Sequence, residues 1–346
     1  MKIIVTHSSP DMDAITSVWL IRKFLQGWEN SQVQFVPAGE RLVGKRLASS
    51  KLASSSDSKD QKLNAKRYTL GAIEVINGHE VIHVDTGLGP LDHHQTSSDE
   101  VCGASLTWDY VRIRNQESGI RGVEDKKWRE KEKAVSRMVR VVVDIDHFKE
   151  VFRKDPLSDY HEFDIAAVLD GLKLQKPNQD EFYVNFISDC LDAVLHEFEN
   201  RIWAEKEIKE DGIKFETRFG KGMGFETIND SVIKLAQKMG YVIVVRKDPR
   251  KGYVRVKALP SKKRLVSKRL ASSSDSKDPK LNAKRYTLDA GIDLTLVYEK
   301  LRKMDPSATW FLHVSKKMLL NGSVKNPKMR PTRLGLSDII GVLEKI

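Results

Sequence analysis

Cysteine and long apolar runs are scarce in this 346-residue sequence. Only two cysteines occur, Cys102 and Cys190, which excludes a disulfide framework and a cysteine-based zinc site. No apolar run approaches the roughly 18 residues that a membrane-spanning helix needs, so no membrane span is expected. The apolar stretch at residues 3–5 is far too short for a signal peptide, and we therefore expect a cytoplasmic protein.

The net charge of +11 suggests a nucleic-acid-binding protein until the charge is located in the sequence. Residues 41–70 and 264–288 are copies of one segment; the first copy carries five extra residues, 51–55, and 23 of the other 25 positions agree. The copies hold 15 of the 59 basic and 4 of the 48 acidic residues, so the remainder of the chain is neutral. Their Ser/Lys/Asp-rich composition predicts exposed, largely disordered insertions. They are either neutral insertions or basic arms that help to capture polyanions.

The N-terminal part alternates predicted strands with predicted helices. Residues 2–6 form a β-rich run, and after a polar turn Ala14, Val18, Ile21 and Leu25 recur at helical spacing. Further strands are predicted at residues 33–36 and 81–84, with helices over 104–113 and 131–143. This alternation is typical of an α/β domain, here residues 1–150, with a parallel sheet that helices cover on both faces.

A smaller mixed α+β domain is predicted for residues 181–346. It begins with a long amphipathic helix marked by Ile187, Leu191, Val194, Leu195, Phe198 and Ile202. A hairpin is predicted from residues 241–245 and 253–256, and later a helix at 294–303, a strand at 310–314 and a helix at 336–344.

Three short motifs contain the residues with evident chemical potential: THSSPDMDA (6–14), HVDTG (83–87) and LDHHQ (91–95). In a parallel sheet, ligand sites lie beyond the carboxyl ends of the strands, and all three motifs are predicted there. Their acidic and imidazole side chains therefore form a candidate two-metal site. The predicted metal ligands are His7, Asp11, Asp13, Asp85 and His93.

Asp85 and the Asp-His-His triplet have different predicted roles in the candidate site. Asp85, which ends a central strand, is placed between two cations, and either His94 or Asp92 would orient or protonate a leaving oxygen. A later carboxylate should complete the set, with Asp144 as the first choice and Asp146 as the second. A purely structural alternative for the first motif is a helix N-cap, with Asp13 as the cap.

This donor set predicts the metal and the reaction. Sites rich in carboxylates with a few imidazoles suit Mn²⁺ or Mg²⁺ better than zinc. Two such ions about 3.5–4 Å apart would clamp a phosphoryl group and activate a shared water. We therefore expect two divalent cations, most simply Mn²⁺, in a phosphoester hydrolase.

The three motifs together resemble those of the DHH phosphoesterase superfamily, which includes RecJ-like exonucleases, cyclic-dinucleotide phosphodiesterases and manganese pyrophosphatases. Within it, the chain is most similar to the Myg (melanocyte proliferating gene) exonucleases, once labelled metal-dependent protein hydrolases. The similar features are DHHQ at 92–95, CGASLTWDYV at 102–111, the Val-Asp-x-Asp region and WFLHVSKKMLLNGS at 310–323. The resemblance implies a DHH-type catalytic domain, two Mn²⁺ ions held by the residues above, His94 near the phosphate, and 3′→5′ exoribonuclease activity.

A basic, turn-rich segment near the C-terminus is a candidate substrate clamp. Backbone amides beside a glycine, with cations nearby, suit a phosphate or a terminal nucleotide. The alternative is an ordinary basic surface loop. The clamp residues would be His313, Gly322, Lys325, Arg330 and Arg333.

The sequence thus predicts a phosphodiester-cleaving enzyme whose partner is a short RNA or another small phosphoester. Few aromatic residues are interleaved with the C-terminal cations, so an extended stacking groove for long nucleic acid is not supported. Two alternatives stay open: a small-molecule phosphohydrolase acting on pyrophosphate or cyclic dinucleotides, and a metal- or RNA-binding protein without turnover.

Overall fold

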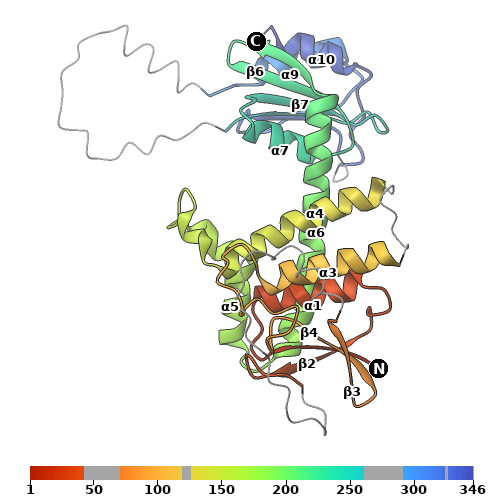
Figure 1. Ribbon diagram of the computed structural model, residues 1–346. Coiled ribbons are helices and arrows are strands. Elements are labelled where there is room, and N and C mark those ends of the chain that lie inside the picture. The colour runs from red at the N-terminus through yellow and green to blue at the C-terminus, as the bar shows by residue number, and fades with distance from the viewer. Residues whose placement is uncertain (43–70, 119–125, 261–290, 324–325, 346) are drawn as a thin grey trace, which may run out of the picture. The chain divides into compact units, whose positions relative to one another are not determined.

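The computed structural model describes residues 1–42, 71–118, 126–260, 291–323 and 326–345 (Figure 1). The fold is mixed α/β with two sheets, one in each of two compact units, Met1–Glu199 and Asn200–Ile346. Except for Arg41 and Leu42, both copies of the duplicated segment lie outside the described residues, so their predicted disorder stays a prediction. Within the described ranges, no helix is long and apolar enough to cross a membrane.

The N-terminal unit contains a four-stranded sheet in the order β2-β1-β4-β3. β1 (Lys2–His7) lies parallel to both β2 (Gln32–Val36) and β4 (His79–His83), as the sequence predicts. β3 (Ile73–Ile76) is antiparallel to β4, which corrects the expectation of a purely parallel sheet. Only two residues, Asn77 and Gly78, join these strands, and such a short link allows only an antiparallel hairpin.

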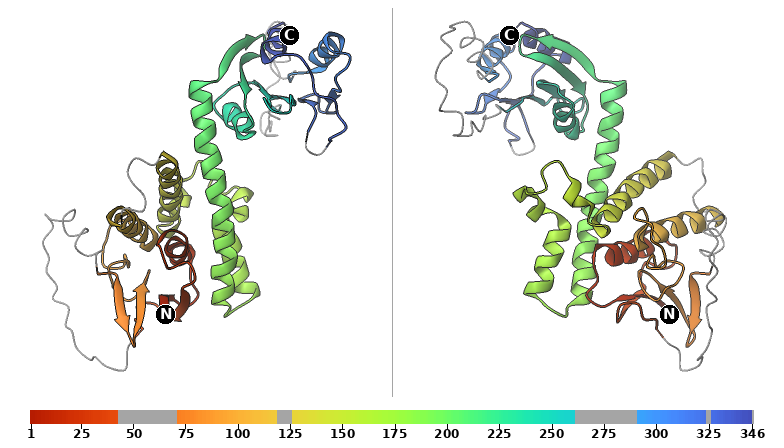
Figure 2. Two further views of the ribbon diagram at one scale, coloured as in Figure 1. Left: turned by 90° about the vertical axis from the view of Figure 1, so that its right-hand side faces the viewer. Right: turned by 60° about the vertical axis from the view of Figure 1, so that its left-hand side comes forward.

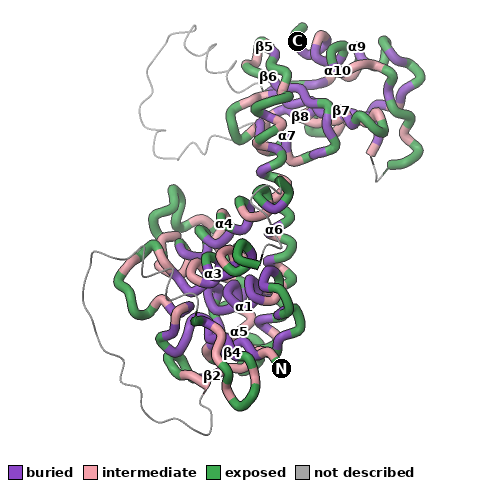
Figure 3. The backbone as a smooth tube through the Cα atoms, turned by 45° about the vertical axis from the view of Figure 1, so that its right-hand side comes forward, coloured by how far each residue is buried: buried purple, intermediate pink, exposed green. Residues whose placement is uncertain are grey.

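Three helices of this unit pack together beside the sheet: α1 (Met12–Phe24), α3 (Gly103–Glu117) and α4 (Lys126–Asp146). They lie above the sheet in Figure 1. α1 is buried on nearly its whole circumference because it contacts β1 as well as both other helices, and Figure 3 shows this buried run. The ring of Phe24 packs edge-on against Trp19, Trp108 and Trp128.

A second apolar cluster in this unit involves Ile3, Val5, Val36 and Val81. Leu42, the last described residue before position 71, packs against this cluster. Because residues 43–70 are outside the described part of the chain, the predicted helical cover on both faces of the sheet is not tested.

The first insertion begins later than its sequence repeat suggests. Arg41 donates to the carbonyl oxygen of Gly87 at 2.9 Å and forms an ion pair with Glu74. The backbone N–H of Leu42 donates to Nε2 of His83 at 3.1 Å. Both residues therefore belong to the folded domain, although they match the duplicated segment.

The segment after α4 contains two 3₁₀ turns, η1 (Lys149–Phe152) and η2 (Asp159–Phe163), and then α5 (Ile165–Gln175). α6 (Asp180–Glu210) follows as one continuous helix (Figure 2). The division between the units falls inside α6, at Glu199–Asn200, rather than near the expected residues 150–181. The reason is that the first half of α6 binds α1: Asp192 accepts from Nε1 of Trp19 at 2.6 Å and pairs with Lys23 at 2.7 Å.

The C-terminal unit contains a six-stranded sheet in the order β5-β6-β7-β8-β10-β9. Among the described strands of this sheet, β6 and β7 are the one parallel pair of neighbours, so the mixed α+β prediction is confirmed, and β7 and β8 form the predicted hairpin. The predicted strand at 310–314 is only two residues long, because the chain turns at His313–Lys316 into β10. The elements are β5 (Ile213–Thr217), β6 (Gly220–Glu226), α7 (Ser231–Lys238), β7 (Ile243–Lys247), β8 (Val254–Ala258), α9 (Thr295–Met304), β9 (Phe311–Leu312), β10 (Met318–Asn321) and α10 (Leu336–Leu343).

Candidate metal centre

The first motif lies between the end of β1 and the first turn of α1. Nε2 of His7 lies 3.9 Å from Oδ2 of Asp11. Oδ1 of Asp11 accepts from the backbone N–H of Ala14 at 3.0 Å, so Asp11 caps α1. The alternative that made Asp13 the cap is therefore wrong, since Asp13 lies one residue inside the helix.

Asp13 is buried and joins α1 to the N-terminus of α3. Its two carboxylate oxygens accept from the backbone N–H groups of Gly103 and Ala104, each at 2.6 Å. The N-terminus of a helix favours negative charge, which stabilises the carboxylate there. Oδ2 of Asp13 also lies 3.8 Å from Nε2 of His93, so Asp13 borders the cluster although its oxygens already have partners.

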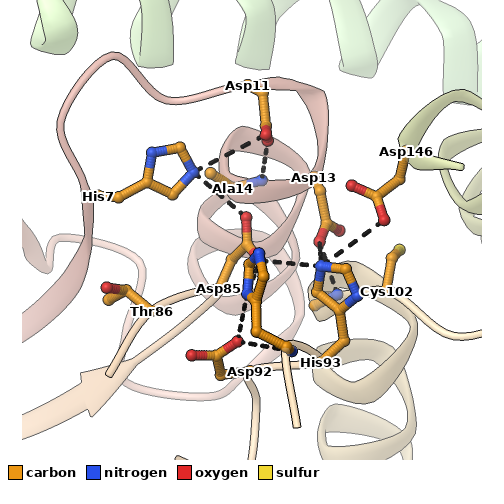
Figure 4. Close-up of polar contacts among 12 residues, drawn as sticks. His7, Asp11, Asp13, Ala14, Asp85, Thr86, Asp92, His93, Cys102 and Asp146 are labelled. Carbon is orange, nitrogen blue, oxygen red and sulfur yellow. Dashed lines mark hydrogen bonds and ion pairs between the residues drawn. The ribbon is translucent and has the colours of Figure 1, made fainter. Parts of the chain in front are cut away.

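Asp85 is at the centre of the cluster, two residues beyond β4 (Figure 4). Its left-handed backbone, with a φ of 51°, and its N–H bond to Leu91 at 3.0 Å fix its orientation. Oδ2 lies 3.3 Å from Nε2 of His7, while Oδ1 lies 3.5 Å from Nε2 of His93. Oδ1 is buried and has no hydrogen-bond partner among the described residues.

The Asp-His-His triplet divides its functions between structure and site. Asp92 is buried, and its oxygens accept from Leu88 N at 2.7 Å and from the backbone N and the ring Nδ1 of His94 at 3.0 and 2.7 Å. The side chain of His94 is 59% exposed, whereas that of His93 is 12% exposed and faces Asp85. Asp92 therefore orients His94 and is itself too enclosed to meet a substrate.

The later carboxylate that the structure brings to the site is Asp146. Its Oδ2 lies 3.6 Å from Nε2 of His93, whereas Asp144, the first choice from the sequence, is exposed. The order of preference changes because α4 continues to residue 146: two residues along a helix turn a side chain by about 200°, so the two aspartates face different sides.

Sequence reasoning did not include His147 or Cys102 in the site. Nε2 of His147 hydrogen-bonds to the Val101 carbonyl at 2.9 Å and lies 3.6 Å from Asp146. The Cys102 thiol hydrogen-bonds to Asp13, and burial raises the pKa of this thiol, which keeps it neutral. The helix start at CGAS was the available signal, because its free N–H groups require an acceptor.

Burial is the main cause of the pKa shifts in this cluster. It raises the pKa of Asp13 well above its usual range, and with the repulsion of Asp11 it raises the pKa of Asp85 to about 8. Burial also raises the pKa of Asp146, although His93 opposes this change, and it lowers the pKa of His93. Several carboxylates thus lie close together with little solvent and few hydrogen-bond donors around them. A bound cation would relieve the repulsion between their negative charges.

Three overlapping groups of side chains have donor atoms within 4.8 Å of one another, as metal ligation requires. Asp85 belongs to two of them, and His93 also belongs to two. The three groups therefore share donor residues. They are His7 with Asp11 and Asp85; Asp85 with His93 and His94; and His93 with Asp146 and His147.

The structure does not assemble the predicted C-terminal clamp as one group. Arg330 lines a cavity beside α9, which does not include His313, Gly322 or Arg333. His313 bonds to Ser315 in its own turn, and Gly322, with a φ of 79°, makes room for the ring of Tyr253. Lys325 lies outside the described residues, so its role stays a prediction.

Comparisons with known proteins do not identify a family. No family model matches the chain, and no curated protein matches it.

Proposed function

We propose that the N-terminal unit binds two divalent cations and hydrolyses phosphoesters. One relationship carries this proposal: the two oxygens of Asp85 face different histidines, Oδ2 facing His7 and Oδ1 facing His93. A carboxylate that shares its oxygens between two sets of nitrogen and oxygen donors is the usual bridge in a two-metal site. These histidines do not complete the hydrogen bonding of Asp85, because Oδ1 has no hydrogen-bond partner among the described residues.

The residues present fit two such ions. His7 and Asp11 would hold one cation, His93 and Asp146 would hold the other, and Asp85 would lie between them. Asp13 supports the site through the N-terminus of α3. Oxygen donors with a few imidazoles favour Mn²⁺ or Mg²⁺. When bound, the cations would supply Lewis-acid stabilisation of a phosphoryl group and an activated water.

The chain's own contribution to the chemistry centres on His94. Its ring is exposed at the edge of the cluster, and Asp92 holds Nδ1 at 2.7 Å, so that Nε2, which no other described residue binds, can meet a substrate. An imidazole oriented in this way can donate a proton to a leaving oxygen. Asp92 is a positioning residue here, because its own oxygens are already bonded to Leu88 and His94.

The finer assignment rests on the sequence resemblance. A DHH-type domain in the Myg family would act as a 3′→5′ exonuclease on short RNA in the cytoplasm, and this is the substrate that we propose first. Pyrophosphate and cyclic dinucleotides are the other phosphoesters to compare.

The proposal can be tested with the full chain, Mn²⁺ and three substrates: end-labelled short RNA, a cyclic dinucleotide and pyrophosphate. We expect Mn²⁺-dependent turnover of at least one, with RNA shortened from its 3′ end. An Asp85→Asn variant should lose this turnover, and an Asp211→Asn variant, altered at an exposed position in the C-terminal unit, should keep it. Absence of turnover on all three substrates, or equal turnover by Asp85→Asn, would contradict the proposal.

A further inference from the structure

The C-terminal unit contains a cavity of about 570 Å³ that shares no residue with the cluster around Asp85. It lies between one face of α9 and the segment 306–310, and Arg330 contributes to its wall. Ligand-binding cavities in proteins usually measure about 300–1,000 Å³. The cavity is therefore large enough for an organic molecule and much larger than a single inorganic ion requires.

Positive charge dominates the lining of this cavity. Among the described lining residues, Arg302, Lys303 and Arg330 contribute three cations and Glu299 contributes one carboxylate. In the described part of the chain, the side chains of Lys303 and Arg330 have no ion-pair or hydrogen-bond partner. Two unpaired cations beside one cavity favour an anion there.

Arg302 is already held in position. Its guanidinium lies 5.3 Å from the centre of the Tyr298 ring, and its Nη1 donates to the Tyr298 hydroxyl at 3.3 Å. A guanidinium held by one of its nitrogens keeps further N–H groups available for the fork-like contacts that phosphate oxygens accept. The other walls are less polar and come from Pro306, Ala308 and Trp310.

The wall opposite α9 is fixed before any ligand binds. Thr309 and Arg330 are joined twice, because Thr309 N donates to the Arg330 carbonyl at 3.0 Å and Arg330 N donates to Thr309 Oγ1 at 3.2 Å. Asp305 anchors the start of this segment by accepting from Thr332 Oγ1 at 2.7 Å and Arg333 N at 2.9 Å. A preformed wall reduces the ordering that binding would otherwise require.

We infer that this cavity binds an organic phosphate of about nucleotide size, with Lys303 and Arg330 contacting the phosphate. The unpaired cations select the phosphate, and the half-buried Tyr298 with its less polar neighbours accommodates the organic part. The inference does not depend on the metal centre, because the cavity lies wholly within Asn200–Ile346.

The test is calorimetric titration of the full chain with AMP, ribose 5-phosphate, adenosine and inorganic phosphate. EDTA is present throughout, so that the proposed metal centre holds no cation. AMP or ribose 5-phosphate should bind, and adenosine and inorganic phosphate should bind at least tenfold more weakly. Lys303→Ala and Arg330→Ala should each weaken binding by about tenfold or more, because each removes a charged contact to the phosphate.

Two controls make the result decisive. Lys300→Ala removes an exposed cation of α9 that does not line the cavity, and this variant should bind as the unaltered chain does. Asp85→Asn alters the metal centre and should also leave binding unchanged. Equal binding of adenosine and AMP, binding of inorganic phosphate as strong as that of AMP, or equal weakening by Lys300→Ala and Arg330→Ala would overturn the inference.

Discussion

The buried carboxylate of Asp92 holds the exposed ring of His94 through Nδ1 at 2.7 Å. The same oxygen accepts from the backbone N–H of His94, while the other accepts from Leu88. The Asp-His-His triplet is thus a small framework in which one aspartate fixes the loop and presents a histidine, while His93 turns inward to Asp85.

This framework predicts different effects for the two residues. His94→Gln should lower kcat for phosphoester hydrolysis about 10²–10⁴-fold, because it removes the proposed proton donor. Asp92→Asn should lower kcat less, and it should also lower the free energy of unfolding, since two backbone N–H groups and the His94 ring N–H lose an anionic acceptor. Steady-state kinetics and urea unfolding measure these effects. His196→Gln alters an exposed histidine on α6 and serves as the control, and wild-type kcat in His94→Gln would contradict the assignment.

The assignment of the later ligand predicts a contrast between two neighbouring aspartates. Asp146→Asn should raise the Kd for Mn²⁺ by about 10–100-fold, because Asp146 lies 3.6 Å from His93. Asp144→Asn should leave it unchanged, since Asp144 is exposed on another side of the same helix. Calorimetric titration with Mn²⁺ measures the Kd of both variants. The same Kd in both would contradict the assignment of Asp146, and not Asp144, as the ligand.

Gly103 packs so closely against Asp13 and Asp85 that a larger residue should not fit there. A Cβ atom at this position would lie 2.9 Å from both Asp13 Oδ2 and Asp85 Cβ. Gly103→Ala should therefore lower the free energy of unfolding by about 1–3 kcal/mol and weaken Mn²⁺ binding. The matched control is Gly171→Ala in α5, where a Cβ meets nothing within 4 Å; it should stabilise the chain by up to about 1 kcal/mol. If urea unfolding gives both variants the same change in the free energy of unfolding, the proposed crowding around Gly103 is wrong.

Asp305 predicts a pH-dependent contribution to stability in the C-terminal unit. Hydrogen bonds from Ser307, Arg333 and Thr332 hold the pKa of Asp305 well below its usual range. Because the folded-state pKa is lowered, the stabilisation is fully present above the unfolded pKa of about 3.9 and is lost as the pH falls below it.

Asp305→Asn should therefore lower the free energy of unfolding by about 1–3 kcal/mol at pH 7. The difference from the unaltered chain should narrow at pH 2.5. Denaturant unfolding at both pH values provides the measurement, with Asp211→Asn as an exposed control. A difference of the same size at both pH values would contradict a role for the charge.

The sequence predicted the elements whose pattern is local. β1, α1 and the β7–β8 hairpin follow from apolar spacing and polar turns, and the three motifs do meet at one edge of the sheet. Their meeting was predictable because parallel strands end at the same edge.

The features that sequence reasoning missed depend on tertiary contacts. The last turn of α4 decides between Asp144 and Asp146, and apolar spacing does not locate a helix end to within one turn. The position of the domain boundary depends on Asp192 of α6 binding Trp19 of α1, a contact across 173 positions that no local pattern reveals. Likewise, only the folded chain shows that Arg41 belongs to the domain and not to the insertion.

Asp85 is proposed to bridge two cations, and electron paramagnetic resonance of the Mn²⁺-loaded chain tests this role most directly. Two Mn²⁺ ions joined by one carboxylate are coupled magnetically, so we predict two ions per chain and a coupled spectrum. Asp85→Asn should abolish the coupling. A six-line spectrum of isolated Mn²⁺ in the unaltered chain, with one ion bound, would contradict the account.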